Sequence, residues 1–104
     1  MSSAELPDLL SLRGRVALVT GAARGIGAAT ARAFAAHGAQ LALLDREPEA
    51  LRQVAAETGG VPYPADVTDA AAVGRAVDDA VARWGRVDIL LNNDKVDALS
   101  ALIH

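Results

Sequence analysis

One short stretch, residues 16–27, limits the fold of this chain more than any other. An apolar run from Val16 to Val19 leads through Thr20 into a turn with glycine at positions 21, 25 and 27. The run is short and contains β-branched residues, which is typical of a parallel strand buried on both faces. Glycine at position 21 allows the backbone to turn sharply as it leaves the strand. The stretch therefore predicts a strand, a tight turn and a helix in direct succession.

The same turn has the chemistry of a phosphate site. Gly25 and Gly27 lack a Cβ atom, so a ligand can approach the backbone closely and the helix can pack tightly on the strand. The free N–H groups of the first helical turn, together with the helix dipole, favour an anion such as a pyrophosphate. The alternative is a tight strand-to-helix turn that binds nothing.

The spacing T-G-x-x-x-G-I-G at residues 20–27 resembles the glycine motif of the short-chain dehydrogenase/reductase family. The resemblance extends over about residues 14–93. It implies an enzyme that moves hydride between NAD(P) and an alcohol or ketone. Within the motif it implies cofactor contacts from Gly21, Arg24, Gly25, Ile26 and Gly27.

The rest of the chain alternates between strand and helix patterns. Strands are predicted at about 15–20, 40–44, 61–65 and 87–91, and helices at about 25–37, 47–58 and 69–84. This alternation predicts an α/β fold of three layers, Rossmann-type, with a partial doubly wound parallel sheet in the strand order 3-2-1-4. Pro62 and Pro64 cannot donate ladder hydrogen bonds, so the third strand belongs at a sheet edge.

Helical spacing also predicts which side chains are buried. The first helix is expected to bury one face, made of Ile26, Thr30, Ala33, Phe34 and His37. The third helix is expected to begin at Thr68 as its N-cap. Its core face is expected to contain Val73, Val77, Val81 and Trp84.

An acidic residue ends the second predicted strand. Asp45 follows Gly27 by 18 residues, close to the spacing of about 20 expected in dinucleotide-binding folds. A carboxylate there can accept hydrogen bonds from the adenosine ribose hydroxyls and would repel a 2′-phosphate. Asp45 therefore favours NAD, and NADP is less expected, although the guanidinium of Arg46 can accommodate a phosphate. The alternative is a polar loop residue or helix cap.

Two further motifs follow the third and fourth strands. In the family resembled, an Asp-Val pair holds the adenine ring, which implies this role for Asp66 and Val67. The alternative is that both belong to a capping turn. The Asn92-Asn93 pair resembles the family's N-N-A-G stretch, which implies that Asn92 lies on the nicotinamide-ribose side. Asp94 and Lys95 replace the family's Ala and Gly here.

No catalytic residue is predicted. In the family a Ser and a Y-x-x-x-K pair perform the chemistry, the Lys lowering the pKa of the Tyr. The single tyrosine, Tyr63, is followed four residues later by Val67, and no serine lies between residues 12 and 99. We therefore expect no turnover by this chain alone. The alternatives are a non-catalytic module that binds a nucleotide or a partner, and a truncated or redesigned chain without its own activity.

Composition excludes several other classes of protein. The net charge of −3 gives no basic surface for nucleic acid, and the absence of cysteine excludes disulfides and thiolate metal sites, so no metal site is predicted. The apolar runs are too short to span a bilayer. Residues 1–7 contain neither the basic nor the apolar segment of a secretion signal, so the cytoplasm is the expected compartment.

Three segments are expected: a flexible lead-in at 1–13, a dinucleotide-binding half-domain at 14–93 and a short atypical tail at 94–104, which could form one or two helical turns.

One helix cannot cover the second face of a four-stranded sheet. The largely apolar fourth strand would also be an exposed edge. We therefore expect self-association through the fourth strand and the uncovered sheet face.

Overall fold

Within residues 11–93, which a computed structural model describes, four strands and three helices alternate. The strands are β1 (Val16–Thr20), β2 (Gln40–Asp45), β3 (Val61–Pro64) and β4 (Ile89–Leu91). The helices are α2 (Gly25–Ala36), α3 (Pro48–Thr58) and α4 (Ala70–Trp84). The predicted elements are confirmed in type and order. The proposed tail at 94–104, including Asp94 and Lys95, lies outside the described residues, as does most of the proposed lead-in.

The four strands form one parallel sheet in the order β3-β2-β1-β4, which confirms the predicted Rossmann-type topology. Thr20 pairs with Leu44, and Asp45 pairs with Pro64, so neighbouring strands end nearly level with one another. The segments that follow the four strands therefore meet along one side of the sheet, which we call the carboxyl edge. Ligands of such folds bind outside this edge.

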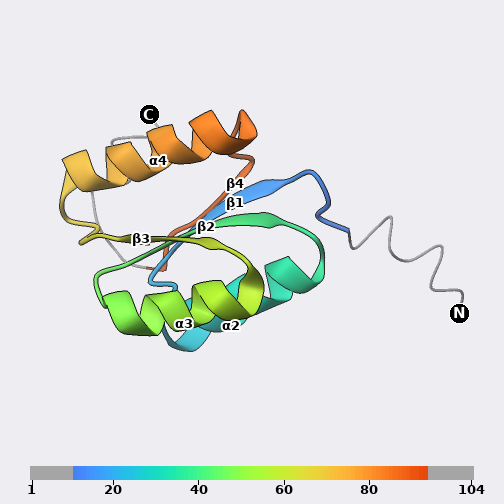
Figure 1. Ribbon diagram of the computed structural model, residues 1–104, viewed down its shortest axis with the longest axis horizontal. Coiled ribbons are helices and arrows are strands. Elements are labelled where there is room, and N and C mark those ends of the chain that lie inside the picture. Colours follow the sequence, from blue (N-terminus) through green and yellow to red (C-terminus); the bar gives the residue numbers. More distant parts are fainter. Residues whose placement is uncertain (1–10, 94–104) are drawn as a thin grey trace, which may run out of the picture.

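The helices cover the sheet from both faces. Helices α2 and α3 lie on one face and α4 lies on the other (Figure 1). Right-handed crossovers between parallel strands predict this division, because β1, β2 and β3 progress in one direction and the chain then returns to the far side of β1. The result is a three-layer α/β/α arrangement whose second face has a single described helix.

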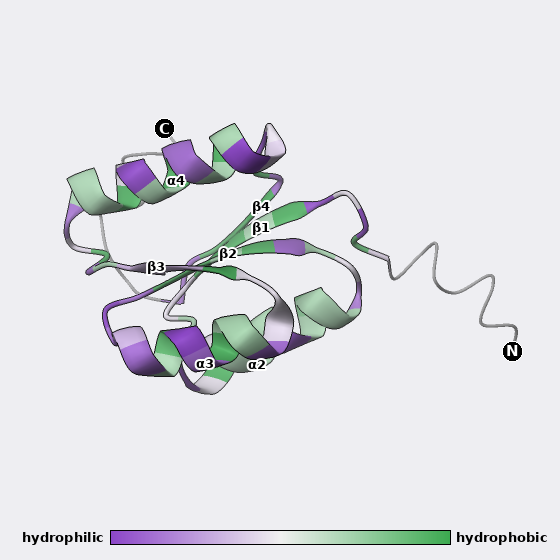
Figure 2. Ribbon diagram, viewed as in Figure 1, coloured by the Kyte–Doolittle hydropathy of each residue, from purple (hydrophilic) through white to green (hydrophobic). Residues whose placement is uncertain are grey.

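Two apolar clusters, one on each face of the sheet, hold the layers together. The hydrophobic strand segments that contribute to them are green in Figure 2. Every residue of β1 is buried. Because successive side chains of a strand point to opposite faces, β1 contributes to both clusters. Ala17 and Val19 pack with α2 and α3, whereas Leu18 packs with α4. Ala28 and Ala31 are buried beneath α2, and such short side chains let a helix approach the sheet closely.

The face of α2 predicted from helical spacing is not the buried one, although Phe34 on that face packs partly against the core. The buried residues are Gly27, Ala28 and Ala31, whereas Ile26 is 78% exposed. Alanine occurs on all sides of this helix, so its apolar pattern does not single out one face. The tight contact of Gly27 with the preceding turn fixes the rotation of the helix instead.

The expected face and start of α4 also need correction. Val73 is fully buried as predicted, but Val81 is 43% exposed, and Ala76 and Ala80 are buried in its place. The N-cap is Asp69, whose carboxylate accepts hydrogen bonds from the N–H groups of Ala71 and Ala72 at 3.1 and 3.2 Å. Thr68 is not the cap because its hydroxyl donates to the Asp66 carboxylate at 2.7 Å.

The backbone nitrogens of the two prolines in β3 lie on the side of the strand that faces away from β2. The N–H of Ala65 donates to the carbonyl of Asp45 at 2.9 Å, so residues two and four positions earlier also direct their N–H groups toward β2. Pro62 and Pro64 therefore occupy positions whose N–H groups would point outward. Their missing donors blunt this edge against pairing with another strand. The predicted edge position of β3 is confirmed.

At the opposite end of the sheet, Asp88 fastens β4 to β1. Its carboxylate accepts the Val16 N–H at 2.8 Å and the Arg86 Nε–H at 3.0 Å, and its own N–H donates to the Val16 carbonyl at 2.8 Å. The Val16 hydrogen bond is the main reason that the pKa of Asp88 lies below its ordinary value. The charge of Asp88 thus stabilises the first pairing between these strands.

The only tyrosine joins β3 to α4. The Tyr63 hydroxyl donates to the Asp79 carboxylate, which also accepts from Arg83 Nε at 2.7 Å. Burial and the neighbouring Asp79 carboxylate raise the pKa of Tyr63 from 10.0 to about 12. Tyr63 therefore has a structural partner and is not poised to exchange a proton near neutral pH.

We expect the folded protein to lose stability as the pH rises from 10 toward 12. The folded-state pKa of Tyr63 exceeds its unfolded value, so its contribution is complete below pH 10 and disappears as the phenol ionises near pH 12. Ultraviolet absorbance of tyrosinate measures this single group directly. Asp79→Asn should lower the midpoint toward 10, whereas Asp78→Asn, the adjacent exposed carboxylate, should leave it unchanged. Equal midpoints in the two variants would contradict the assignment.

Candidate functional site

The glycine turn after β1 has two glycines with different tasks. A Cβ at Gly27 would lie 2.7 Å from the carbonyl carbon of Gly21 and would overlap its oxygen, so α2 can begin here only with glycine. A Cβ at Gly25 would meet nothing within 4 Å, and Gly25 has a φ of +56°. Gly27 is thus required by packing within the chain. Gly25 leaves a free approach to the backbone from outside.

The first turn of α2 has no side-chain cap. Arg24 is the N-cap residue, and its side chain makes no capping hydrogen bond. In α4, by contrast, Asp69 caps the corresponding groups. The N-terminus of α2 therefore presents N–H groups and the positive end of the helix dipole beside the open face of Gly25, as a bound anion requires.

Asp45 connects the glycine turn to the end of β2. Its Oδ2 accepts the N–H of Ala23 at 3.1 Å, and its Oδ1 accepts the N–H of Glu47 at 3.0 Å. The turn is also tied to β2 by the Ala22 N–H, which donates to the Leu44 carbonyl at 3.1 Å. Each carboxylate oxygen has two lone pairs, so Asp45 can accept further hydrogen bonds while it stays held in place.

Charged side chains lie on the two loops that hold Asp45 at the carboxyl edge. Arg24 Nε lies 3.1 Å from Glu47 Oε2, which joins the loop after β1 to the loop after β2. The charge of Arg46 is the last of the causes that lower the pKa of Asp66. Ile26, 78% exposed, supplies an apolar surface one residue beyond Gly25.

Asp66 and Val67 form the turn that follows β3. The Asp66 carboxylate accepts the N–H of Thr68 at 2.9 Å and the Thr68 hydroxyl at 2.7 Å. These bonds, the backbone one first, lower the pKa of Asp66 below its ordinary value. Val67 is buried in the cluster beneath α4. The turn is thus held by its own hydrogen bonds, while its adenine-binding role stays a prediction.

Thr20 links the ends of β1 and β4, a role that the sequence did not reveal. Its buried hydroxyl donates to Asn92 Oδ1 at 3.0 Å and accepts the N–H of Asn93 at 3.0 Å. The Asn93 side chain donates to the Thr20 carbonyl at 2.8 Å. The signal for this link is a threonine that ends one strand and an Asn-Asn pair that ends another. Only the strand order makes them neighbours.

The predicted cofactor residues all lie along the carboxyl edge. The loop after β1 and the first turn of α2 together provide five of them, the end of β2 provides Asp45, the turn after β3 provides Asp66 and Val67, and the segment after β4 provides Asn92. In the part of the chain that is described, no group of three or more His, Cys, Asp or Glu side chains is placed to hold a metal ion. No described helix has both the length and the apolarity to cross a membrane.

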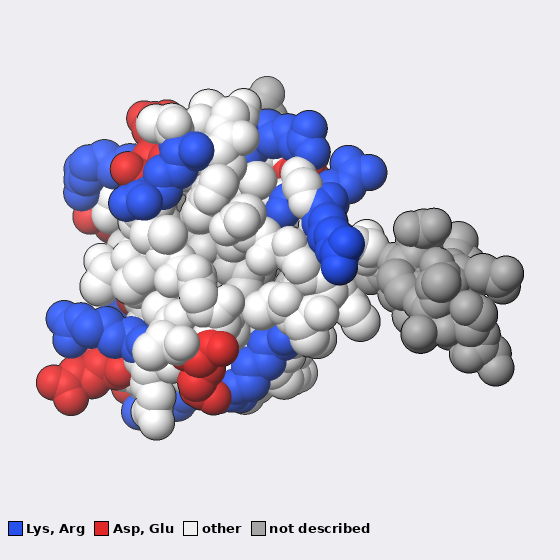
Figure 3. Space-filling view, turned by 45° about the vertical axis from the view of Figure 1, so that its right-hand side comes forward, with Lys and Arg blue, Asp and Glu red and all other residues white. Residues whose placement is uncertain are grey.

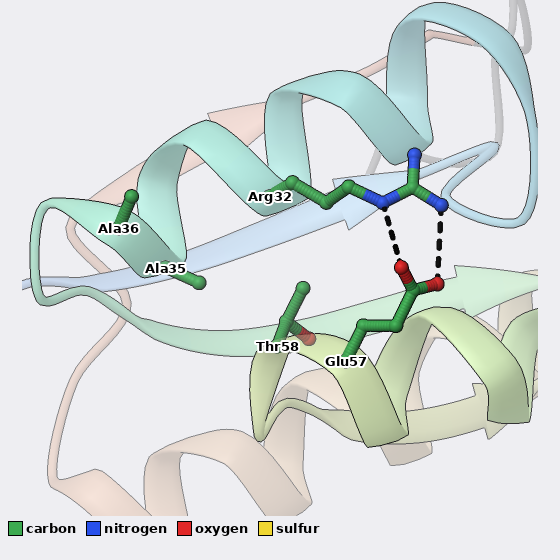
Figure 4. A pocket seen from close by; sticks show the side chains of 5 residues that line it. All are labelled: Arg32, Ala35, Ala36, Glu57 and Thr58. Atoms are coloured by element: carbon green, nitrogen blue, oxygen red, sulfur yellow. Dashed lines mark hydrogen bonds and ion pairs between the residues drawn. The ribbon is translucent and has the colours of Figure 1, made fainter.

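Two further pockets lie between neighbouring elements, and the side chains of Arg32, Glu57 and Tyr63 that line them already have partners within the protein. Figure 4 shows one of about 350 Å³ between α2 and α3, where Arg32 and Glu57 form two hydrogen bonds at 3.1 and 3.2 Å. Another, of about 330 Å³, lies between β3 and α4 beside Tyr63. On the face seen in Figure 3, charges of both signs lie above and below a band of uncharged residues. This face has no continuous basic surface.

The parallel sheet and its glycine turn define a Rossmann-type nucleotide-binding domain. Residues 15–100 match the family described as short chain dehydrogenase. The chain therefore belongs to the short-chain dehydrogenase family and has the dinucleotide-binding fold of that family.

Individual relatives agree with this family. The chain is 43% identical to sorbitol dehydrogenase of Cereibacter sphaeroides, over 91% of this chain and 38% of that protein. A dehydrogenase/reductase from Sinorhizobium meliloti 1021 superposes with a TM-score of 0.82 at 36% identity, covering 86% of this chain and 38% of that one. The 3-ketoacyl-(acyl-carrier-protein) reductase of Brucella melitensis, solved with NADH, has a TM-score of 0.73 at 40% identity, with 77% and 34% covered. The chain thus spans less than two fifths of these relatives.

We expect Gly27→Ala to destabilise the protein by about 3 kcal/mol, because the backbone of Gly21 and Ala22 leaves no room for the new methyl group. Helix propensity alone would predict a gain of about 1 kcal/mol, so the sign of the change tests the packing explanation. Denaturant unfolding measures it. A variant as stable as the parent would show that the turn can relax around a Cβ.

Proposed function

We propose that this chain is the NAD-binding part of an oxidoreductase that transfers hydride between the cofactor and an alcohol or ketone. The observation that supports this most directly is the pairing of an open glycine turn with an acidic side chain held beside it. Gly25 leaves the start of α2 accessible, and Asp45 is fixed by the N–H of Ala23 in the same turn. The relative from Brucella melitensis was solved with NADH.

Each part of the cofactor has candidate partners. The pyrophosphate would lie on the N–H groups at the start of α2, above Gly25, with Gly21, Arg24, Ile26 and Gly27 around it. The Asp45 carboxylate would accept from the adenosine ribose hydroxyls, and Asp66 and Val67 would flank the adenine. Asn92, whose Oδ1 accepts from Thr20, would lie on the nicotinamide-ribose side. A bound nicotinamide supplies the hydride acceptor or donor of such a reaction.

We propose that NAD is preferred over NADP. A 2′-phosphate would lie against the Asp45 carboxylate, where like charges repel. The cytoplasmic location expected from the sequence stays a prediction.

Turnover, we propose, needs residues that this sequence does not contain. It has no Y-x-x-x-K pair and no serine between residues 12 and 99, and Tyr63 already donates to Asp79. A module that binds the nucleotide without turnover is therefore the second candidate function. The chain alone should therefore not oxidise NADH in the presence of ketones, and consumption of NADH by the chain alone would contradict this part of the proposal.

We expect calorimetric titration to detect NADH binding and Gly25→Ala to weaken it at least tenfold. The new methyl group would occupy the space over which the phosphate approaches. Gly59→Ala is the matched control, because Gly59 also has a positive φ, of +75°, and open space around it, but ends α3 away from the turn. Both variants should lose about 1–2 kcal/mol of stability from backbone strain. Only Gly25→Ala should lose affinity. The absence of heat with either NADH or NADPH would refute the proposed function.

We also propose that the chain self-associates through β4 and the sheet face beside α4. Among the described strands β4 is an edge, and its three residues are only partly buried. The Asp88 N–H donates to the Val16 carbonyl. The N–H of Leu90, two residues later, therefore also points toward β1, and the N–H of Ile89 points away from it. No proline blunts this edge as Pro62 and Pro64 blunt β3.

Light scattering during size-exclusion chromatography should show a mass above that of one chain, rising with concentration. Ile89→Pro removes an outward N–H and should weaken association about tenfold while the sheet persists. Leu90→Pro removes an N–H directed at β1 and should unfold the chain instead. A parent protein that stays monomeric from micromolar to millimolar concentration would contradict this proposal.

A further inference from the structure

An ion pair crosses the carboxyl edge next to Asp45. Arg24, from the loop after β1, pairs with Glu47, from the loop after β2, at 3.1 Å. The backbone N–H of Glu47 donates to Asp45 Oδ1, and the N–H of Ala23 donates to Asp45 Oδ2. The ion pair and the Asp45 carboxylate are thus built from the same two loops, through adjacent residues.

The guanidinium of Arg24 already pairs with a carboxylate, that of Glu47. A guanidinium is the group best suited to bind a phosphate through two hydrogen bonds. Left without its partner, Arg24 would be such a group, one loop away from the carboxylate that is expected to meet the ribose.

We infer that Glu47 is a specificity-determining residue, which holds Arg24 away from a 2′-phosphate. The inference rests on the proposed function, because it assumes that the adenosine ribose lies at Asp45. Two carboxylates would then discriminate against NADP. Asp45 contacts the ribose, and Glu47 engages Arg24 in an ion pair.

The exposure of the pair makes this role testable. The side chains of Arg24 and Glu47 are 73% and 46% exposed, and ion pairs this accessible to water contribute little to folding. Removal of the Glu47 charge should therefore leave the fold intact. The freed Arg24 can then turn to a doubly charged phosphate, which attracts it more strongly than one carboxylate does.

The experiment compares NADH and NADPH binding to the 104-residue chain and its variants by calorimetric titration at low salt. Glu47→Gln should tighten NADPH binding about tenfold and change NADH binding less than about twofold. Glu49→Gln is the matched control, because Glu49 is also exposed in the first turn of α3 and loses the same charge. It should change neither affinity more than about twofold. Arg24→Ala in the Glu47→Gln background should abolish the gain.

Each pattern of results decides a separate point. An equal gain in Glu47→Gln and Glu49→Gln would overturn the inference, because net charge alone would then explain it. A gain that survives Arg24→Ala, or a parent protein that binds NADPH as tightly as NADH, would also overturn it. NADH binding without any shift in preference would refute the inference and leave the proposed function standing. No binding of either nucleotide to any variant would refute both.

Discussion

The contact between Gly27 and the carbonyl of Gly21 is the constraint on which the rest of the structure depends. Because a Cβ there would overlap that carbonyl, α2 can start immediately after β1 only in this sequence context. The contact fixes the rotation of α2, which buries Ala28 and Ala31 against the sheet and turns Ile26 outward. The same close packing leaves the N–H groups of the first helical turn facing the carboxyl edge. One steric requirement thus sets both the core and the site.

The two ends of the sheet use polar groups in different ways. At the amino end, Asp88 and Arg86 bond to backbone groups of neighbouring segments, and both the N–H and the carbonyl of Val16 bond to Asp88. At the carboxyl edge, Asp45 also accepts backbone N–H groups, but its oxygens retain unused lone pairs. The first arrangement fastens strands together. The second holds a carboxylate in position where a ligand of this fold family binds.

Local patterns predicted the elements because each pattern has a local cause. The β-branched runs, the helix-ending glycines and the prolines of β3 act within a few residues of themselves. The predictions failed where burial depends on distant partners. Alanine occurs all around α2 and so gives no preferred face, and Thr68 is diverted from capping α4 by its hydrogen bond to Asp66.

The sequence by itself determined the strand-turn-helix motif, the parallel three-layer topology and the positions of the candidate cofactor residues at strand ends. These follow from spacing, since each strand end exposes the residue that comes next in the chain. Only the tertiary structure decided how those ends interact: Thr20 with the two asparagines after β4, Asp45 with Ala23, and Arg24 with Glu47. The partners lie 22 to 73 residues apart along the chain. Sheet order and register bring them within hydrogen-bonding distance, and no local preference encodes that.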